Sequence, residues 1–210
     1  MGSADRTAGA EIPTGVLRGA AGAGIGEDRE NSDRSGVDAV LFETASGRAG
    51  VKEKAEKRRE RHAKIAIGCD HGGFEWKEAV RGYLEENGID YEDFGAFSTE
   101  SVDYAPIAAK AARTVAEGKA DYGILICSTG LGVSMAANKV KGIRAAVCTN
   151  AFCAEMTRRH NNANVLCMGG KVVDRETALQ MVDIFLHTAF DGGRHQRRID
   201  QIAQIEEGVL

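Results

Sequence analysis

Residues 122–127 read YGILIC, and this stretch decides the fold. Its centre, ILIC, is apolar at successive positions, which is typical of a strand buried on both faces. The glycine-containing sequence STGLG follows at once, and residues 132–140 then have the apolar spacing of a helix. A strand of this kind that leads into a helix indicates a central parallel strand with helices packed on each side.

The same alternation extends along the chain on both sides of this unit. Short apolar runs predict five strands, at residues 64–69, 89–94, 122–127, 144–148 and 164–169. Amphipathic stretches predict helices at residues 74–87, 104–117, 132–140, 151–161, 175–189 and 193–207. Strand–helix units in this order predict an α/β fold: a doubly wound, mostly parallel five-stranded sheet with helices on both faces, a Rossmann-like three-layer sandwich. In such sheets ligands bind at the carboxyl ends of the strands.

The composition changes near residue 63. Residues 1–63 are rich in glycine and small polar residues without a sustained period, as in GAAGAGIG at 19–26. We expect this extension to be of low complexity and disordered, with a possible charged helix at residues 51–62, VKEKAEKRRERH. Residues 64–210 then form the functional domain.

Charge and cysteine usage exclude several classes of protein. The 27 basic and 31 acidic side chains give a net charge of −4, which argues against binding to nucleic acid or to a membrane surface. No apolar run approaches the roughly 20 residues of a membrane-spanning helix. The 5 cysteines form no CxxC pair, so neither a disulfide framework nor a thiolate zinc site is indicated, and we expect a cytoplasmic protein.

Two predicted strands end in loops that suit an anion. CDHGG follows the first strand at residues 69–73, and CSTGLG spans residues 127–132. A glycine-containing turn that enters a helix presents backbone N–H groups to a phosphate or an oxyanion. A cysteine phosphatase loop would need an arginine six residues after the cysteine, and Val133 stands there instead.

Two further clusters add cationic groups. His160 and Asn161 end one predicted helix, and Arg194 and Arg198 are spaced i, i+4 on another, where paired guanidinium groups suit a phosphate. Taken singly, these residues have ordinary alternatives: a solvated helix surface for the arginines, a helix cap for His160 and a buried strand thiol for Cys127. We expect all of them to meet at one edge of the sheet, which favours a site.

Together these motifs resemble ribose-5-phosphate isomerase type B, a family that includes the galactose-6-phosphate isomerase subunits. The resemblance extends over residues 64–210 in order, whereas residues 1–63 have no counterpart in a typical member. It is carried by GCDHGGF at 68–74, VDY at 102–104, GILICSTGLGVSMAANK at 123–139, GIRAAVC at 142–148, RRHNNANVLCMGG at 158–170 and GGRHQRRI at 192–199.

The resemblance implies an aldose–ketose isomerase that works through a cis-enediolate without metal or cofactor. Ribose 5-phosphate and ribulose 5-phosphate, as in the pentose phosphate pathway, are the first choice of substrate. The alternatives are allose 6-phosphate, galactose 6-phosphate, a tetrose phosphate, or a non-catalytic sugar-phosphate-binding module. Members of the family are homodimers or dimers of dimers whose sites are shared between subunits, and we expect the same here.

The resemblance also implies roles for individual residues. Cys127 matches the catalytic base, the loop amides with Thr129 match the oxyanion donors, and His160 with Asp70 match the ring-opening groups. The expected catalytic residues are therefore Cys127, Thr129, His160 and Asp70. The expected substrate-binding residues are His71, Tyr104, Ser128, Gly130, Gly132, Asn161, Lys171, Arg194 and Arg198.

Three positions depart from the commoner family pattern. Ser128 replaces a glycine and would narrow the loop if that position required a positive φ. Lys171 replaces an arginine and keeps the charge without the bidentate fork. The proline that usually follows the tyrosine directly is displaced in DYAPIA at 103–108, which could shift Tyr104 in the sugar pocket.

Overall fold

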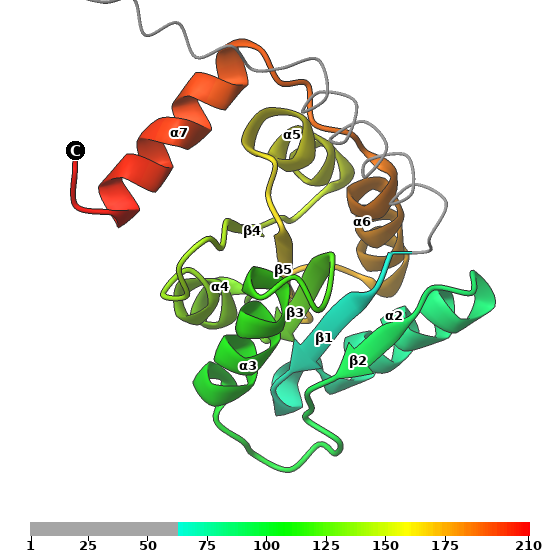
Figure 1. The fold of residues 1–210 in the computed structure, drawn as a ribbon. Helices are drawn as coiled ribbons and strands as arrows, with labels where there is room; N and C mark the ends of the chain where they lie inside the picture. Colours follow the sequence, from blue (N-terminus) through cyan, green and yellow to red (C-terminus); the bar gives the residue numbers. More distant parts are fainter. Residues whose placement is uncertain (1–62) are drawn as a thin grey trace, which may run out of the picture. The chain divides into compact units, whose positions relative to one another are not determined.

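The computed structural model describes residues 63–210. The expectations for residues 1–62, including the charged helix at 51–62, lie outside the described residues. The domain contains one parallel five-stranded sheet with the strand order β2-β1-β3-β5-β4, which confirms the predicted fold class (Figure 1). Its strands are β1 (Ile65–Cys69), β2 (Tyr91–Asp93), β3 (Tyr122–Cys127), β4 (Ala145–Val147) and β5 (Val165–Gly169).

The helices predicted within residues 64–210 are all present. The helices are α2 (Phe74–Glu86), α3 (Tyr104–Ala116), α4 (Leu131–Ala137), α5 (Ala151–Asn161), α6 (Arg175–His187) and α7 (Arg194–Glu206). A short 3-10 turn, η1 (His71–Gly73), precedes α2 and was not predicted. Within residues 63–210, no helix has the length and apolar character that crossing a bilayer requires.

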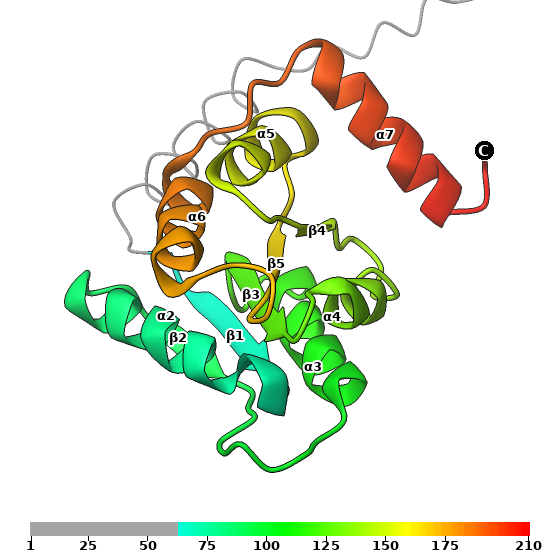
Figure 2. The same ribbon diagram turned by 180° about the vertical axis from the view of Figure 1, so that it is seen from behind.

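The two faces of the sheet carry separate apolar cores because successive strand side chains point to opposite faces. In β3, Ile124 and Ile126 pack with residues of α2, α5 and α6. Leu125 and Cys127 point the other way, into a core that α3 and α4 close. Figure 2 shows α2 and α6 on one side of the sheet, with α3 and α4 on the other. The order of buried residues in YGILIC therefore places the Cys127 side chain on the α3–α4 face.

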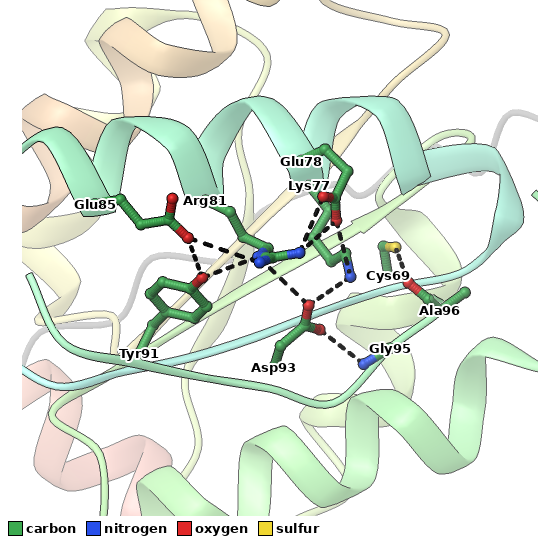
Figure 3. Close-up of polar contacts among 9 residues, drawn as sticks. All are labelled: Cys69, Lys77, Glu78, Arg81, Glu85, Tyr91, Asp93, Gly95 and Ala96. Atoms are coloured by element: carbon green, nitrogen blue, oxygen red, sulfur yellow. Dashed lines mark hydrogen bonds and ion pairs between the residues drawn. The ribbon is translucent and has the colours of Figure 1, made fainter. Parts of the chain in front are cut away.

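A buried ion pair fixes the chain after β2 (Figure 3). The fully buried Lys77 of α2 places its Nζ 2.6 Å from Oδ2 of Asp93, and Oδ1 of Asp93 accepts the Gly95 N–H at 2.9 Å. Arg81 contributes a second cation near the same carboxylate, with its Nε 3.8 Å from Oδ2, and also donates to the Tyr91 hydroxyl at 3.0 Å. These contacts tie α2 to β2 and set the start of the loop that leads to α3.

Candidate active site

The loop after β3 is organised around the Cys127 thiol. Cys127 is the last residue of β3, and the Gly130 N–H donates to its Sγ at 3.0 Å. Gly130 has φ 79°, and a Cβ there would lie 2.9 Å from the carbonyl carbon of Met168. Glycine is therefore required at this position for both its backbone conformation and the space beneath it. The turn brings the amino end of α4 close to the sulfur.

Ser128 and Thr129 complete this loop. The Thr129 hydroxyl accepts the Leu131 N–H at 3.4 Å, at the start of α4. The Ser128 side chain packs directly against Gly72 of η1. A Cβ added to Gly72 would lie only 2.2 Å from the Ser128 Oγ. Asn162 is the one non-glycine residue with positive φ among residues 63–210, so Ser128 needs no left-handed conformation. The loop takes its positive φ at Gly130 instead, and the serine is accommodated.

Asp70 and His71 lie beside this loop at the end of β1. Asp70 is 7% exposed, and its Oδ1 accepts the N–H groups of Gly72 at 2.8 Å and Gly73 at 3.1 Å. Nδ1 of the exposed His71 accepts the Val102 N–H at 3.4 Å, which connects η1 to the segment before α3. Asp70 thus shapes the turn with one carboxylate oxygen.

Tyr104 and Lys171 belong to the same edge of the sheet. Tyr104 begins α3, and its ring packs against Gly132 of α4. A Cβ added to Gly132 would lie only 2.7 Å from the Tyr104 Cζ. The Lys171 N–H donates to the Ser128 carbonyl at 3.0 Å, just after β5 ends. These residues and those of the two loops form the first group, which surrounds the carboxyl ends of β1, β3 and β5: Asp70, His71, Tyr104, Cys127, Ser128, Thr129, Gly130, Gly132 and Lys171.

The remaining candidates lie elsewhere. His160 and Asn161 end α5, which runs back from the carboxyl end of β4 to the amino end of β5. Arg194 and Arg198 are on the first turns of α7, beside α5 (Figure 1). These four residues form the second group.

The expectation that all candidates share one edge of the sheet is wrong within a single chain. Cys127 pairs with Gly169 at one end of β5, whereas Val165 begins β5 just after α5 ends. A five-residue strand spans about 16 Å, so the two groups lie at opposite edges. The physical reason lies in the crossover between parallel strands. Its helix begins at the carboxyl edge of the sheet and returns the chain to the amino edge, so the last turn of the helix lies at the amino edge.

Within the second group, His160 stacks on a histidine that was not among the expected site residues, His195. The His160 and His195 rings stack with centroids 4.3 Å apart and planes at 5°. Burial lowers the pKa of His195 below its usual 6.5, and His160, Arg194 and Arg198 lower this pKa further. The signal in the sequence was the i, i+4 spacing of His195 and Ile199, the two buried residues of α7.

His160, Asp191 and His195 could in principle hold a metal ion, since one ligand atom from each lies within 4.8 Å of the others. Several features oppose it. Parallel stacked rings aim their nitrogen lone pairs in parallel rather than at one point, and Asp191 already pairs with Arg159 at 3.2 Å. The nearby arginines give this cluster a positive surrounding, which favours an anion.

Burial keeps three of the other thiols in their protonated form. It raises the pKa of Cys69 and of Cys148 to about 12, and raises that of the fully buried Cys167 well above its ordinary value. These three thiols stay protonated near neutral pH. Cys127 is 5% exposed. Its sulfur accepts a hydrogen bond from the backbone N–H of Gly130, in the glycine loop at the edge of the sheet.

A cavity of about 300 Å³ lies away from Cys127, beside the second group. Asn161, Arg144 and Ile202 of α7 are among its lining residues. The Arg144 guanidinium already donates to the carbonyls of Asn161 and Asn162, at 3.1 and 2.9 Å. The cavity is therefore a gap between α7 and the rest of the domain. The guanidinium group that lines it, that of Arg144, is already hydrogen-bonded to the backbone.

Comparisons with known proteins identify the family of the chain. The profile of the Ribose/Galactose Isomerase family matches residues 65–202. The chain is 47% identical to ribose-5-phosphate isomerase B of Escherichia coli over 144 residues, which are 69% of this chain and 97% of that protein. The structure of ribose-5-phosphate isomerase B from Clostridium thermocellum is similar with a TM-score of 0.68 and 49% identity, covering 70% of this chain and 99% of that one. The enzyme from Mycoplasma genitalium, solved with bound ribulose 5-phosphate, has a TM-score of 0.67 and 41% identity, covering 69% and 96%.

Proposed function

The chain belongs to the ribose/galactose isomerase family, and from this premise we propose that it interconverts ribose 5-phosphate and ribulose 5-phosphate. The observation that carries the chemistry is the contact of the Gly130 N–H with Cys127 Sγ, 3.0 Å long, at the amino end of α4. Oriented N–H groups favour a thiolate over a thiol. A sulfur so placed can act as a base beside donors for a developing oxyanion.

In the proposed reaction Cys127 removes the proton from C2 of the open-chain aldose. The electron pair of that C–H bond forms the C1–C2 double bond of a cis-enediolate, and the carbonyl oxygen on C1 gains the negative charge. The hydroxyl proton of O2 then passes to O1, and the thiol returns its proton to C1 to give the ketose. The loop amides and the Thr129 hydroxyl stabilise the charged intermediate, and one such donor is typically worth about 3 kcal/mol.

Residues of both groups assist this reaction. His160 and Asp70 open the furanose ring of ribose 5-phosphate, and Tyr104 and Asn161 orient the sugar hydroxyls. The phosphate is held by cations of both groups: His71, Lys171, Arg194 and Arg198. Lys171 supplies a point charge where a planar fork would bind bidentately, so we expect it to contribute less than the arginines.

We propose that a second copy of the chain completes each site. The two groups lie at opposite edges of one sheet, so a single copy cannot bring His160 to Cys127. In a symmetric dimer each copy can offer its first group to the second group of the other. Exposed apolar side chains occur near both groups, with Leu131 at 53% and Met135 at 65% on α4, and Ile202 at 47% and Ile205 at 59% on α7. These side chains are candidates for burial between copies.

A reducing compartment such as the cytoplasm suits this chemistry, because the base has to remain a free thiol. The five cysteines, all in the described part of the chain, are free.

The test is a direct assay of the full chain. Incubation with ribose 5-phosphate in D₂O should give ribulose 5-phosphate together with solvent deuterium at the carbon that receives the proton. A parallel panel of allose 6-phosphate, galactose 6-phosphate and a tetrose phosphate ranks the sugars. Binding of ribose 5-phosphate without any isomerisation or deuterium exchange would instead support a sugar-phosphate-binding module.

A further inference from the structure

The first turn of α7 is attached to the last turn of α5 through the stacked rings of His195 and His160. His195 is 8% exposed, whereas Arg194 and Arg198 on the same helix are exposed. The helix therefore buries the histidine and leaves the two guanidinium groups accessible. His160, on the other side of the stack, is half-buried.

The connection between the two helices holds this stack in place. The Asp191 N–H donates to the Arg159 carbonyl at 3.0 Å, and Arg159 Nε lies 3.2 Å from both oxygens of the Asp191 carboxylate. Arg159 also pairs with Glu155 one turn earlier in α5, at 3.1 Å. The segment that enters α7 is thus anchored to the residue next to His160.

The charges around His195 favour its neutral form. Burial lowers the pKa of His195, and the facing His160 and the flanking Arg194 and Arg198 lower it further, while Asp191 acts in the opposite direction. Arg159, whose side chain is partly exposed on α5, adds a cation that Asp191 neutralises. A neutral ring can stack on His160 without the repulsion that two imidazolium ions would have.

We propose that His195 is a positioning residue for ring opening: its stacked ring fixes the orientation of the His160 imidazole beside Arg194 and Arg198. The inference rests on the proposed function, because it requires His160 to act on the cyclic sugar phosphate. An imidazole transfers a proton directly when its nitrogen lies within about 2.6–3.2 Å of the reacting oxygen. Packing one face of the ring removes orientations that would miss this distance.

Two reactions separate ring opening from proton transfer at carbon. Conversion of ribose 5-phosphate begins from a furanose ring and needs both steps. Ribulose 5-phosphate cannot close that ring, because its C5 oxygen carries the phosphate. Exchange of its C1 hydrogen with D₂O, followed by NMR, therefore needs the base at Cys127 but not ring opening.

The variants are His195→Ala, which removes the ring, and His195→Phe, which keeps a ring able to stack. We expect His195→Ala to lower kcat for ribose 5-phosphate by about 10- to 100-fold, as for a misplaced catalytic group. Its C1 exchange with ribulose 5-phosphate should stay near the rate of the unaltered chain. His195→Phe should recover most of the lost turnover. Gln196→Ala, on the exposed side of α7, is the matched control and should leave both rates unchanged.

Other results would overturn the inference. Equal loss of both reactions in His195→Ala would indicate a general structural role, and no loss in either would remove His195 from the mechanism. A phenylalanine variant as slow as the alanine variant would show that stacking is not what matters. If His195→Ala does not fold, His195→Gln fills the same gap without a ring and has to show the same selective loss. If the unaltered chain neither converts nor exchanges, the proposed function itself fails, which is a different outcome from any of these.

Discussion

Cys127 and its loop show how much one residue depends on its neighbours. Cys69 ends β1 and Cys148 directly follows β4, and burial raises the pKa of both thiols to about 12. What distinguishes Cys127 is the turn at Gly130, which returns a backbone N–H to the sulfur. At the residue scale, therefore, chemistry is decided by a backbone conformation that only glycine adopts easily.

Replacing Cys127 by alanine should slow isomerisation strongly while leaving sugar-phosphate binding intact. A general base typically contributes about 10²- to 10⁴-fold to the rate, so we expect kcat to fall by that factor. Calorimetry with ribose 5-phosphate should give an affinity near that of the unaltered chain. Cys153→Ala is the matched control, since Cys153 is on the first turn of α5. A kcat of Cys127→Ala that stays within about tenfold of the unaltered chain would assign the base to another group.

Replacing Gly130 by alanine should cost both stability and activity. A left-handed conformation costs a non-glycine residue about 1–2 kcal/mol, and the added Cβ would also meet the Met168 backbone at 2.9 Å. Gly118→Ala is the control, because Gly118 has φ 70° and nothing within 4 Å of such a Cβ. Denaturant unfolding should show a larger loss for Gly130→Ala, and its kcat should fall while that of Gly118→Ala does not. If the two variants lose the same stability, the Met168 backbone can move away from the new Cβ without a loss of stability.

At the scale of elements, helix and strand ends carry the function, and buried pairs hold them there. α2 is tied to β2 by Lys77 and Asp93, and the chain then passes through Gly95 to the loop before α3 (Figure 3). Tyr104 begins α3 and lies over α4. The position of Tyr104 thus depends on contacts outside the site.

Asp93→Ala should destabilise the domain strongly. It leaves the fully buried Lys77 ammonium without its closest partner, and breaking a buried pair typically costs about 3–5 kcal/mol. The free energy of unfolding in urea measures this loss. Glu117→Ala, which removes the exposed pair between Glu117 and Lys119, should change little. Losses of similar size in the two variants would show that the buried ammonium is compensated by Glu78 and the aromatic rings nearby.

The exposed face of α7 should bind phosphate through Arg198. We expect Arg198→Ala to raise KM for ribose 5-phosphate more than it lowers kcat, because phosphate is bound in both the ground and the transition state. A lost charge-assisted hydrogen bond corresponds to about a 10- to 100-fold weaker interaction. Arg197→Ala is the control on the adjacent, exposed position. If steady-state kinetics of the two variants coincide, Arg198 does not contact the phosphate.

At the scale of the whole molecule, the parallel sheet separates what the reaction has to combine. Every strand runs in the same direction, so the carboxyl edge holds Cys127 while the returning helix α5 leaves His160 at the amino edge. The separation is a property of the topology and not of any side chain. A second copy in a symmetric arrangement resolves it without any change of fold.

Two variants that are each inactive should therefore regain isomerase activity when they form mixed dimers. Cys127→Ala and His160→Ala, coexpressed, should form mixed dimers in which one of the two shared sites is intact. Random pairing then predicts about one quarter of the full activity. Separately purified variants, each nearly inactive, provide the baseline. Coexpression that yields no activity above this baseline, with mixed dimers verified by mass spectrometry, would place each complete site within one chain.

Most of the fold and half of the site followed from local signals. Strand and helix positions depend on apolar periods of two and 3.6 residues, and these are visible without tertiary contacts. The loops at residues 69–73 and 127–132 follow strands directly, so the rule for parallel sheets placed them together. The second group could not be placed in this way, because the end of a helix is fixed by the crossover that it makes.

By itself, the sequence of residues 64–210 determined the order of strands and helices, the glycine loop beside Cys127 and the family, because each depends on residues adjacent along the chain. The tertiary structure alone decided that the second group lies at the edge opposite Cys127, that His195 stacks on His160, and that Lys77 meets Asp93 inside the domain. These features join residues that are distant in sequence. They depend on which surfaces pack together, and local periodicity carries no information about that choice.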